Sequence, residues 1–510
     1  MTPFGKWSPD AATLDVALAG DISGVRPGRT SYVPWPQMAI ASAALPSACR
    51  GAYMARTLSN ASAVFAGTGT RLYKFASMAA WTDFSKGLAD YTVLGTDDLW
   101  QFAQYGPAVY ATNIANPLQS CDVSSGTVFA DVAGSPPKAR YLSVVGDFLM
   151  LGNTETSSRE VRWSSRNDPT TWTRYQRDAD SQQFPDGGDI MGLSGWEQGG
   201  LIFQTEVVRQ MNVRQDAAIM EFHRIEASQG TLAPYSIVNR QGTSYYYAVN
   251  GFQRISTDGS SEGIGANWLD SWFLDNSQAA TRPKAIVGGF TSRTPQIIWL
   301  FASATPSSSS IFDHALCFDP SLTDSDYGPW THAPVSASVI FSSGTTATTL
   351  DGLGTPGLGY ALDPPIPPTT TPLAVPHSLD SDVWKGGAPR LAAFDSDFRM
   401  NFFTGPPMAA TLQTGLFTPV PGSRAYVNGF RLVADAATAT GRIAVTERQQ
   451  TPATWLAPGG ALTNQGIIHS RASGRHMRVE VTIPAGTAWT RASGISLEDD
   501  QALVTAAGGR

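Results

Sequence analysis

Charged side chains, long apolar runs and cysteines are all scarce in this 510-residue chain. Asp, Glu, Lys and Arg make up 15% of the residues, whereas hydrophobic residues make up 42%. Disordered chains show the opposite balance, so we expect packed domains. No stretch approaches the roughly 18 apolar residues of a membrane-spanning helix. The N-terminal sequence MTPFGKWSPD lacks the apolar centre of a signal peptide, so we expect a soluble protein that is not exported by the Sec route.

Metal-binding and redox residues are few and scattered. The three cysteines, Cys49, Cys121 and Cys317, are odd in number and far apart, which favours buried free thiols over a disulfide framework or a cysteine-based metal site. None of the six histidines forms a close pair with metal-ligand spacing. His469 and His476, seven residues apart among arginines, are more typical of a surface strand. We predict neither a metal nor a cofactor.

The charge balance is mildly acidic. Lys and Arg number 35 and Asp and Glu number 42, which gives a formal net charge of −7. Such a chain is a poor candidate for holding nucleic acid by its phosphates, although nucleic acid could pass along it without being held.

Strand and turn signals are abundant, whereas helical periodicity is scarce. Alternating apolar runs joined by Gly-containing or Asn-Gly turns are a strong hairpin signal. They recur at 61–75, 100–123, 139–153, 195–213, 235–256, 285–303 and 314–332. Hairpins repeated at intervals of roughly 40 residues predict an all-β fold built around a β-propeller. A sandwich or a barrel is the structural alternative, and five to seven blades are all compatible with the spacing.

The segment LDPPIPPTTTPLAVP divides the chain, because its prolines exclude a helix and an inner strand. We predict an N-terminal platform segment (1–60), a β-propeller (61–361), a Pro/Thr-rich linker (362–379) and a C-terminal β-domain (380–510). The last has the size of a β-sandwich and a second set of strand signals.

The turn SSRNDPTTW has the spacing of an Asp-box, the Ser-x-Asp-x-Gly-x-x-Trp turn of sialidase-like propellers. Ser165, Asn167, Pro169 and Trp172 occupy its positions, with Asn in place of Asp and Pro in place of Gly. The side chain of Asn167 or Asp168 can accept backbone N–H bonds and hold the turn. Trp172 is then expected to be buried between blades. Because Asp-boxes lie away from the catalytic face of sialidases, we interpret this turn as structural.

The segment DYGPW is a shortened version of the same turn. Asp326, Gly328 and Trp330 are the corresponding residues, and we predict a second structural blade turn here.

Patterns that would carry catalysis are weak. GSSEG (259–263) matches the Gly-x-Ser-x-Gly of a nucleophile elbow at Ser261, but no helix is expected after it. GLGTPG (352–357) matches Gly-x-Gly-x-x-Gly without the following helix that a phosphate site needs. We interpret both as loops.

Two acidic clusters are candidates for acid–base chemistry. They are Asp97 and Asp98 in GTDDLW, and Glu498, Asp499 and Asp500 in LEDD. Nothing in the sequence positions either cluster, so we expect solvated loop carboxylates and predict that the protein is not an enzyme.

The order of the hairpin segments resembles the tail nozzle, or tail hub, proteins of short-tailed bacteriophages, which include tail tubular protein B and its relatives. The resemblance covers about residues 20 to 497. Its segments include VFAGTGTRLYKF, FAQYGPAVYATNIANPLQ, ARYLSVVGDFLMLGN followed by RWSSRNDPTTWT, and GTLAPYSIVNRQGTSYYYAVNGFQRISTDG. Near the C-terminus, GSRAYVNGFRLVAD and SGRHMRVEVTIPAGTAWTRASGI resemble the family's terminal β-domain. The chain is shorter than the largest members, which puts their fibre-holding insertions in doubt.

The resemblance implies a structural virion protein that assembles in the host cytoplasm. Six copies would form a ring, a homohexamer, below the head-to-tail adaptor. Its channel would retain genomic DNA until ejection, and its outer face would dock tail fibres or spikes. Six copies would carry a charge of about −42, which would let DNA slide through without binding. A carbohydrate-binding or glycosidase-like propeller on the virion is the alternative.

Overall fold

The computed structural model describes residues 1–11, 18–58, 61–76, 80–214, 219–226, 228–290, 293–306, 311–344, 389–449, 452–497 and 504–506. Nearly every element in these ranges is a β-strand. The α-helix among them is α1 (Asp270–Asn276), and short 3-10 turns occur at Lys86–Leu88, Pro234–Ser236 (η3) and Pro320–Leu322. No helix in these ranges is long and apolar enough to cross a membrane.

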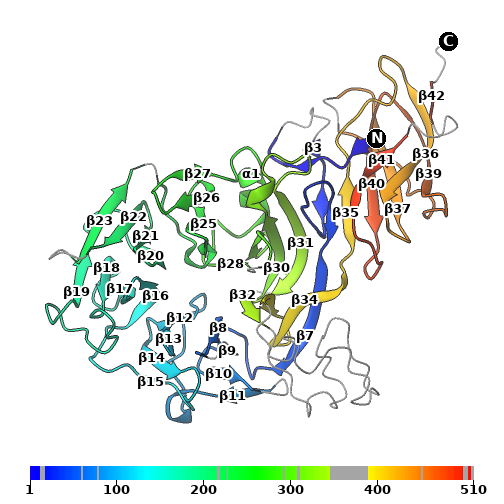
Figure 1. Cartoon of the computed structure of the whole chain (residues 1–510). Coiled ribbons are helices and arrows are strands. Elements are labelled where there is room, and N and C mark those ends of the chain that lie inside the picture. Colours follow the sequence, from blue (N-terminus) through cyan, green and yellow to red (C-terminus); the bar gives the residue numbers. More distant parts are fainter. Residues whose placement is uncertain are drawn as a thin grey trace, which may run out of the picture.

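Within the described ranges, seven four-stranded antiparallel units form the blades of a β-propeller (Figure 1). The strands of each blade are given from the innermost outward. Blade 1 contains β8 (Ala52–Arg56), β9 (Ser62–Gly67), β10 (Leu72–Phe75) and β11 (Trp81–Asp83), and blade 2 contains β12 (Gln101–Tyr105), β13 (Ala108–Asn113), β14 (Asn116–Asp122) and β15 (Ala130–Asp131). Blade 3 contains β16 (Ala139–Val145), β17 (Phe148–Thr154), β18 (Glu160–Trp163) and β19 (Asp180–Gln183). Blade 4 contains β20 (Ile190–Trp196), β21 (Gly199–Gln204), β22 (Val208–Val213) and β23 (Met220–Ile225). Blade 5 contains β24 (Val238–Arg240), β25 (Thr243–Ala248), β26 (Gly251–Ser256) and β27 (Ser261–Gly263). Blade 6 contains β28 (Ile286–Phe290), β29 (Ile297–Phe301), β30 (Phe312–Phe318) and β31 (Trp330–Ala337).

Blade 7 combines strands from distant parts of the chain. It consists of β32 (Val339–Gly344), β33 (Pro389–Phe394), β34 (Arg399–Pro407) and β7 (Pro36–Ala44). The early strand β7 pairs antiparallel with β34, with Ile40 opposite Asn401. This pairing closes the ring, because it ties the start of the propeller to its last blade.

The blades therefore extend beyond the predicted propeller boundaries of 61–361. Strands β7 and β8 come from the predicted platform segment, and β33 and β34 come from the predicted C-terminal domain. Ring closure depends on pairing across more than 300 residues, which a local hairpin pattern does not reveal. The predicted linker (362–379) lies outside the described residues.

The C-terminal domain is a β-sandwich, so the predicted all-β fold with a propeller and a sandwich-like domain is confirmed. One sheet contains β1 (Thr2–Pro3), β41 (Ala492–Ser496), β36 (Ala425–Ala434), β39 (Ile467–Gly474) and β42 (Val504–Ala506). The facing strands are β35 (Ala410–Gln413), β40 (His476–Ile483), β37 (Thr440–Thr446) and β38 (Thr454–Trp455). Phe430, Ile468 and Val479 belong to the buried core between them.

The N-terminal segment joins the two domains. Strand β4 (Ile22–Ser23) pairs with β31 of blade 6 and with β35 of the sandwich, so that one nine-stranded sheet runs through both domains. The short strands β2 (Lys6–Trp7), β3 (Leu18–Ala19), β5 (Val25–Arg26) and β6 (Val33–Pro34) surround this junction. The buried Tyr32 hydroxyl shares its single proton between the carbonyls of Gly5 (2.7 Å) and Tyr327 (2.8 Å). The domains are thus joined by backbone pairing and buried contacts.

Asp10 attaches the same segment to α1. Its carboxylate accepts hydrogen bonds from the backbone N–H groups of Ser271 (2.7 Å) and Trp272 (2.8 Å). Asp270, at the start of α1, accepts a bond from the Phe252 N–H. Burial raises the pKa of Asp270 to about 6, and the nearby Asp10 charge adds to the increase while the Phe252 N–H opposes it. The folded protein therefore holds a proton on Asp270 more tightly than the unfolded chain does.

We expect Asp270→Asn to stabilise the protein at pH 8 and to change its stability less at pH 4.5. Stability falls as the pH rises from the ordinary pKa of 3.8 to about 6, because the folded state must then accommodate the charge. An Asn keeps an acceptor for Phe252 and never ionises. The gain at pH 8 should be about 1 kcal/mol, allowing for partial exposure. Thermal unfolding at both pH values checks this, with the exposed Asp275→Asn as the control. An equal gain at both pH values would contradict the assignment.

Candidate functional site

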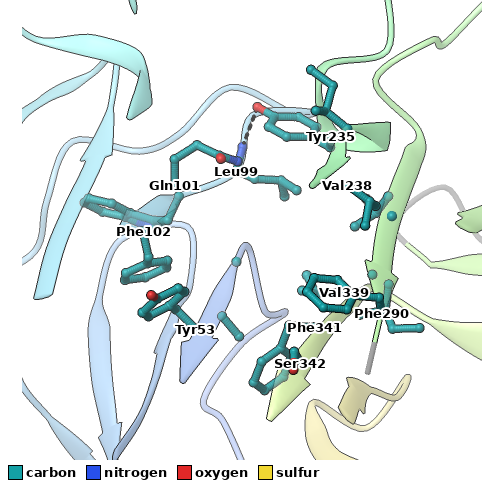
Figure 2. A pocket seen from close by; sticks show the side chains of 18 of the residues that line it. Tyr53, Leu99, Gln101, Phe102, Tyr235, Val238, Phe290, Val339, Phe341 and Ser342 are labelled. Carbon is teal, nitrogen blue, oxygen red and sulfur yellow. Dashed lines mark hydrogen bonds between the residues drawn. The ribbon is translucent and has the colours of Figure 1, made fainter. Parts of the chain in front are cut away.

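The inner strands of the propeller enclose an axial cavity of about 440 Å³. Strands β8, β12, β24, β28 and β32 contribute to its lining (Figure 2). Tyr53 and Phe102 stack on one side, with ring centroids 6.4 Å apart and an interplanar angle of 13°. Phe290 and Phe341 lie across from them.

The chemistry available in the cavity is that of aromatic faces and neutral hydrogen-bonding groups. Gln101, Asn239 and Ser342 are polar lining residues, and the described lining contains no acidic, basic, histidine or cysteine side chain. These groups suit an uncharged ring held by stacking. Acid–base chemistry here would need groups other than these lining side chains.

The loop 95–99, which leads into β12, reaches across one end of the cavity. The backbone N–H of Leu99 donates to the Tyr235 hydroxyl at 3.0 Å, and Figure 2 shows this bond. Tyr235 belongs to η3, which precedes blade 5. The guanidinium of Arg50, just before β8, donates to the carbonyl of Thr96. The loop thus links blades 1, 2 and 5 across the end of the cavity.

Three basic side chains hold the two carboxylates of this loop: Arg140 from blade 3, and Arg282 and Lys284 from the segment just before blade 6. Asp98 is 2.7 Å from the Arg140 guanidinium and 2.8 Å from the Lys284 amine, and its side chain is 15% exposed. Asp97 is 2.6 Å from the guanidinium of Arg282. The expectation of solvated carboxylates is therefore wrong for this pair. The sequence carried no signal for it, because Asp98 and Lys284 lie 186 positions apart.

The electrostatics of Asp98 follow from these partners. Burial by itself would raise the pKa of Asp98, but the hydrogen bond and charge of Lys284, together with Arg140, outweigh it and hold the pKa below its usual value. A carboxylate kept ionised in this way is suited to anchoring the loop and is a poor proton donor.

The turn at 164–172 joins the two outer strands of blade 3, β18 and β19. Asp168 is the residue that organises it. Its carboxylate accepts from the Thr170 N–H (3.1 Å) and hydroxyl (2.6 Å) and from the Thr171 hydroxyl (2.8 Å). These bonds lower the pKa of Asp168, the one from the Thr170 hydroxyl most strongly. Ser165 closes the turn through a bond from its N–H to the Thr171 carbonyl.

Asn167 and Trp172 complete this turn. Asn167 adopts a left-handed backbone with φ of 53°, a conformation that Asn tolerates better than most residues. Trp172 is buried, and its indole N–H donates to the Pro169 carbonyl at 2.7 Å. It packs in a cluster with Tyr110 and Leu118 of blade 2 and with residues of blade 3 that include Leu149. The tryptophan therefore fills the space between these two blades.

The second turn is organised differently from its sequence pattern. Trp330 is buried at the start of β31, with its indole N–H bonded to the Ile264 carbonyl at 3.1 Å. Gly328 has φ of +68°, which favours glycine. Asp326 is exposed. Instead, Asp319 accepts from the N–H (3.0 Å) and the hydroxyl (2.6 Å) of Ser321. Sequence reasoning missed Asp319, although Asp-Pro-Ser is itself a turn signal.

We expect Asp168→Ala and Asp319→Ala each to lower the free energy of unfolding by about 1 kcal/mol, because Asp168 accepts from three turn donors and Asp319 from two, and these would lose their acceptor. Asp326 is the carboxylate that the spacing of the DYGPW motif indicates. Asp326→Ala should nevertheless change the free energy of unfolding by less than about 0.5 kcal/mol. Denaturant unfolding of the three variants checks this order. A larger loss for Asp326→Ala than for Asp319→Ala would show that the second turn is assigned to the wrong carboxylate.

None of the weaker sequence motifs that the structure describes lies in a catalytic or metal-binding setting. Ser261 begins β27, the outer strand of blade 5, so it lacks the strand–turn–helix setting of a nucleophile elbow. His476 bonds to the Thr418 hydroxyl at 2.8 Å. In the part of the chain that the structure describes, no group of three or more His, Cys, Asp or Glu residues could hold a metal ion. GLGTPG and the cluster Glu498, Asp499 and Asp500 lie outside the described residues.

Comparisons with known proteins give only distant similarities. No family model matches the chain, and no curated protein matches it. Among solved structures, the N-terminal domain of Nup159 has a TM-score of 0.39 and 10% identity, over 74% of this chain and 97% of that one. Virginiamycin B lyase from Staphylococcus aureus has a TM-score of 0.36 and 9% identity, over 59% and 89%. U3-55K has a TM-score of 0.36 and 10% identity, over 60% and 89%. Similarities with such low TM-scores and sequence identities indicate no function for this chain.

Proposed function

We propose that this chain is a structural subunit of the hexameric tail nozzle of a short-tailed bacteriophage. In this role six copies surround a channel that retains the genome and releases it at infection. The ring contacts the head-to-tail adaptor above it and tail fibres or spikes at its side. The protein acts in the virion tail, assembles in the host cytoplasm and has no enzymatic activity.

The observation that carries the proposal is the sheet shared by the two domains. Strand β4 pairs with β31 on one side and with β35 on the other, so the propeller and the sandwich are joined by backbone hydrogen bonds. Such joining suits a subunit that must hold its place in a ring. The segments that resemble the nozzle family fall in both the propeller and the sandwich, in the same order.

The axial cavity bears on where DNA would pass. Loop 95–99 reaches across one end of the cavity and is held by Arg140, Arg282 and Lys284. The route for DNA in this proposal is therefore the channel between the six copies, and the propeller of each copy is part of the wall around that channel.

The alternative, a carbohydrate-binding or glycosidase-like propeller, needs two carboxylates about 5 to 9.5 Å apart in a cleft. Asp97 and Asp98, in the loop at one end of the cavity, are both bound to basic side chains. The aromatic lining could still stack against a sugar ring, so binding without cleavage is the form of this alternative that keeps a physical basis.

A cryo-EM reconstruction of the particle that carries this chain tests the proposal. We expect six copies around the tail axis, below the adaptor, with the propellers arranged about an axial channel. A peripheral location or a copy number other than six would overturn it. A glycan-binding screen of the purified protein would then decide whether the alternative replaces it.

A further inference from the structure

Strand β7 has an open outer edge. It is the outermost strand of blade 7, and among the described residues no strand pairs with its other side. It is nine residues long, Pro36–Ala44, and Figure 1 shows it in blue alongside β34. Its pairing with β34 is regular over Met38–Ile40 and shifts register on either side. The regular part of the open edge presents backbone N–H and C=O groups around Ile40 that can pair with another strand.

The other blade edges are protected by coverage, short length or charge, whereas β7 has none of these three and is interrupted only by the register shifts near its two ends. The outer strand of blade 6, β31, pairs with β4 through His332 and Ser23 and also contacts β5. The outer strands of blades 1 to 5 have two to six residues, and each carries at least one charged side chain: Asp83, Asp131, Asp180, Glu221 with Arg224, and Glu262. Short length and charge are the usual devices that prevent edge-to-edge pairing. The sequence of β7, PQMAIASAA, is uncharged throughout and has its proline only at the first position.

The exposed surface of β7 is apolar and small. Ile40, its central residue, is 50% exposed, and Ala43 and Ala44 are also exposed. At the C-terminal end, the indole N–H of Trp81 donates to the Ser42 hydroxyl (3.2 Å) and to the Ala43 carbonyl (3.1 Å). The part of the edge that stays open is therefore centred on Ile40 and its N-terminal neighbours.

We propose that β7 pairs antiparallel with β7 of a second copy of this chain, with a two-fold axis close to Ile40. An extended strand is the partner that matches a row of backbone donors and acceptors. An identical strand meets no like charge here, because β7 carries none, whereas self-pairing of the other uncovered blade edges would bring charged side chains together. The two Ile40 side chains would cover each other at the axis, as an isologous contact requires.

This inference goes beyond the proposed nozzle role and does not depend on it. A contact with two-fold symmetry ends at two copies, whereas a cyclic ring of six is built from heterologous contacts. The β7 dimer is thus a form of the free protein. A failed dimer leaves the ring proposal standing, and a failed ring leaves the dimer standing.

Sedimentation velocity of the full-length protein between about 1 and 50 μM tests the dimer at concentrations where specific dimers form. We expect a species of twice the 54.3 kDa chain mass at the upper concentrations. Ile40→Lys should weaken it by about tenfold or more, because it places two lysines at the axis. Val93→Lys, at an equally aliphatic and 67% exposed position away from β7, should leave the dimer unchanged.

A second variant keeps the test decisive if Ile40→Lys fails to fold. Directly opposite residues of an antiparallel pair have Cα atoms about 4.5 to 5.5 Å apart, within disulfide range. Because all three native cysteines are buried, Ile40→Cys should give a disulfide-linked dimer on mild oxidation, and Val93→Cys should not. A wild-type protein that stays monomeric, a dimer indifferent to Ile40→Lys, or equal cross-linking of both cysteine variants would overturn the proposal.

Discussion

Trp172→Ala is expected to lower the free energy of unfolding by about 3 to 5 kcal/mol, the range found when large buried aromatic residues are truncated. Trp172 is 1% exposed and packs against side chains from blades 2 and 3. Removing the indole would leave a cavity between two sheets. Because hydrogen bonds between strands fix the backbone of each sheet, the neighbouring side chains cannot easily move in to fill this cavity. The Pro169 carbonyl would also lose the indole N–H that it accepts.

Equilibrium unfolding in guanidinium chloride, followed by circular dichroism, measures this loss. Tyr175→Ala is the matched control, because Tyr175 lies in the same connection between β18 and β19 and is 75% exposed. We expect the control to change the unfolding free energy by less than about 0.5 kcal/mol. Equal losses for the two variants would mean that Trp172 does not support the contact between blades.

Asp98→Asn is expected to lower the free energy of unfolding at pH 7 by about 2 kcal/mol, a value reduced from that of a fully buried ion pair because the site is partly exposed. Asp98 binds Arg140 and Lys284, so an uncharged Asn leaves two cations together without their shared anion. The substitution should also loosen loop 95–99. We expect faster amide exchange at Leu99, whose N–H is bonded to Tyr235.

The pH dependence gives this prediction a second readout. The folded-state pKa of Asp98 lies below the ordinary value of 3.8, so folding favours the ionised form. The stabilisation is present above the ordinary pKa and is lost as the pH falls through the folded-state value. Wild type and Asp98→Asn should therefore differ at pH 7 and converge as the pH falls below the ordinary pKa of 3.8. Denaturant unfolding across this range measures the difference, with the exposed Asp326→Asn as the control. A constant offset at all pH values would contradict the ion-pair account.

The hairpins and the tryptophan turn were predictable because their signals are local. An alternating run that stops at Gly106 or Gly146 predicts a strand end from a few residues, and both glycines have the positive φ that such turns need. The spacing of Asp168 and Trp172 also lies within one turn. In the second turn the same reasoning selected Asp326, and the structure has Asp319 in its place, because hydrogen-bond geometry rather than spacing decides which carboxylate is used.

By itself, the sequence determined the strand-rich class, the succession of hairpins and the burial of the turn tryptophans, since each depends on contacts among residues close along the chain. Only the tertiary structure decided the number of blades, the closure of the ring by β7 and the sharing of one sheet between propeller and sandwich. It also decided the pairing of Asp97 and Asp98 with three basic residues. These features join positions that are dozens to hundreds of residues apart. Many pairings of similar strands satisfy the same local pattern, and the packing of the whole ring selects one of them.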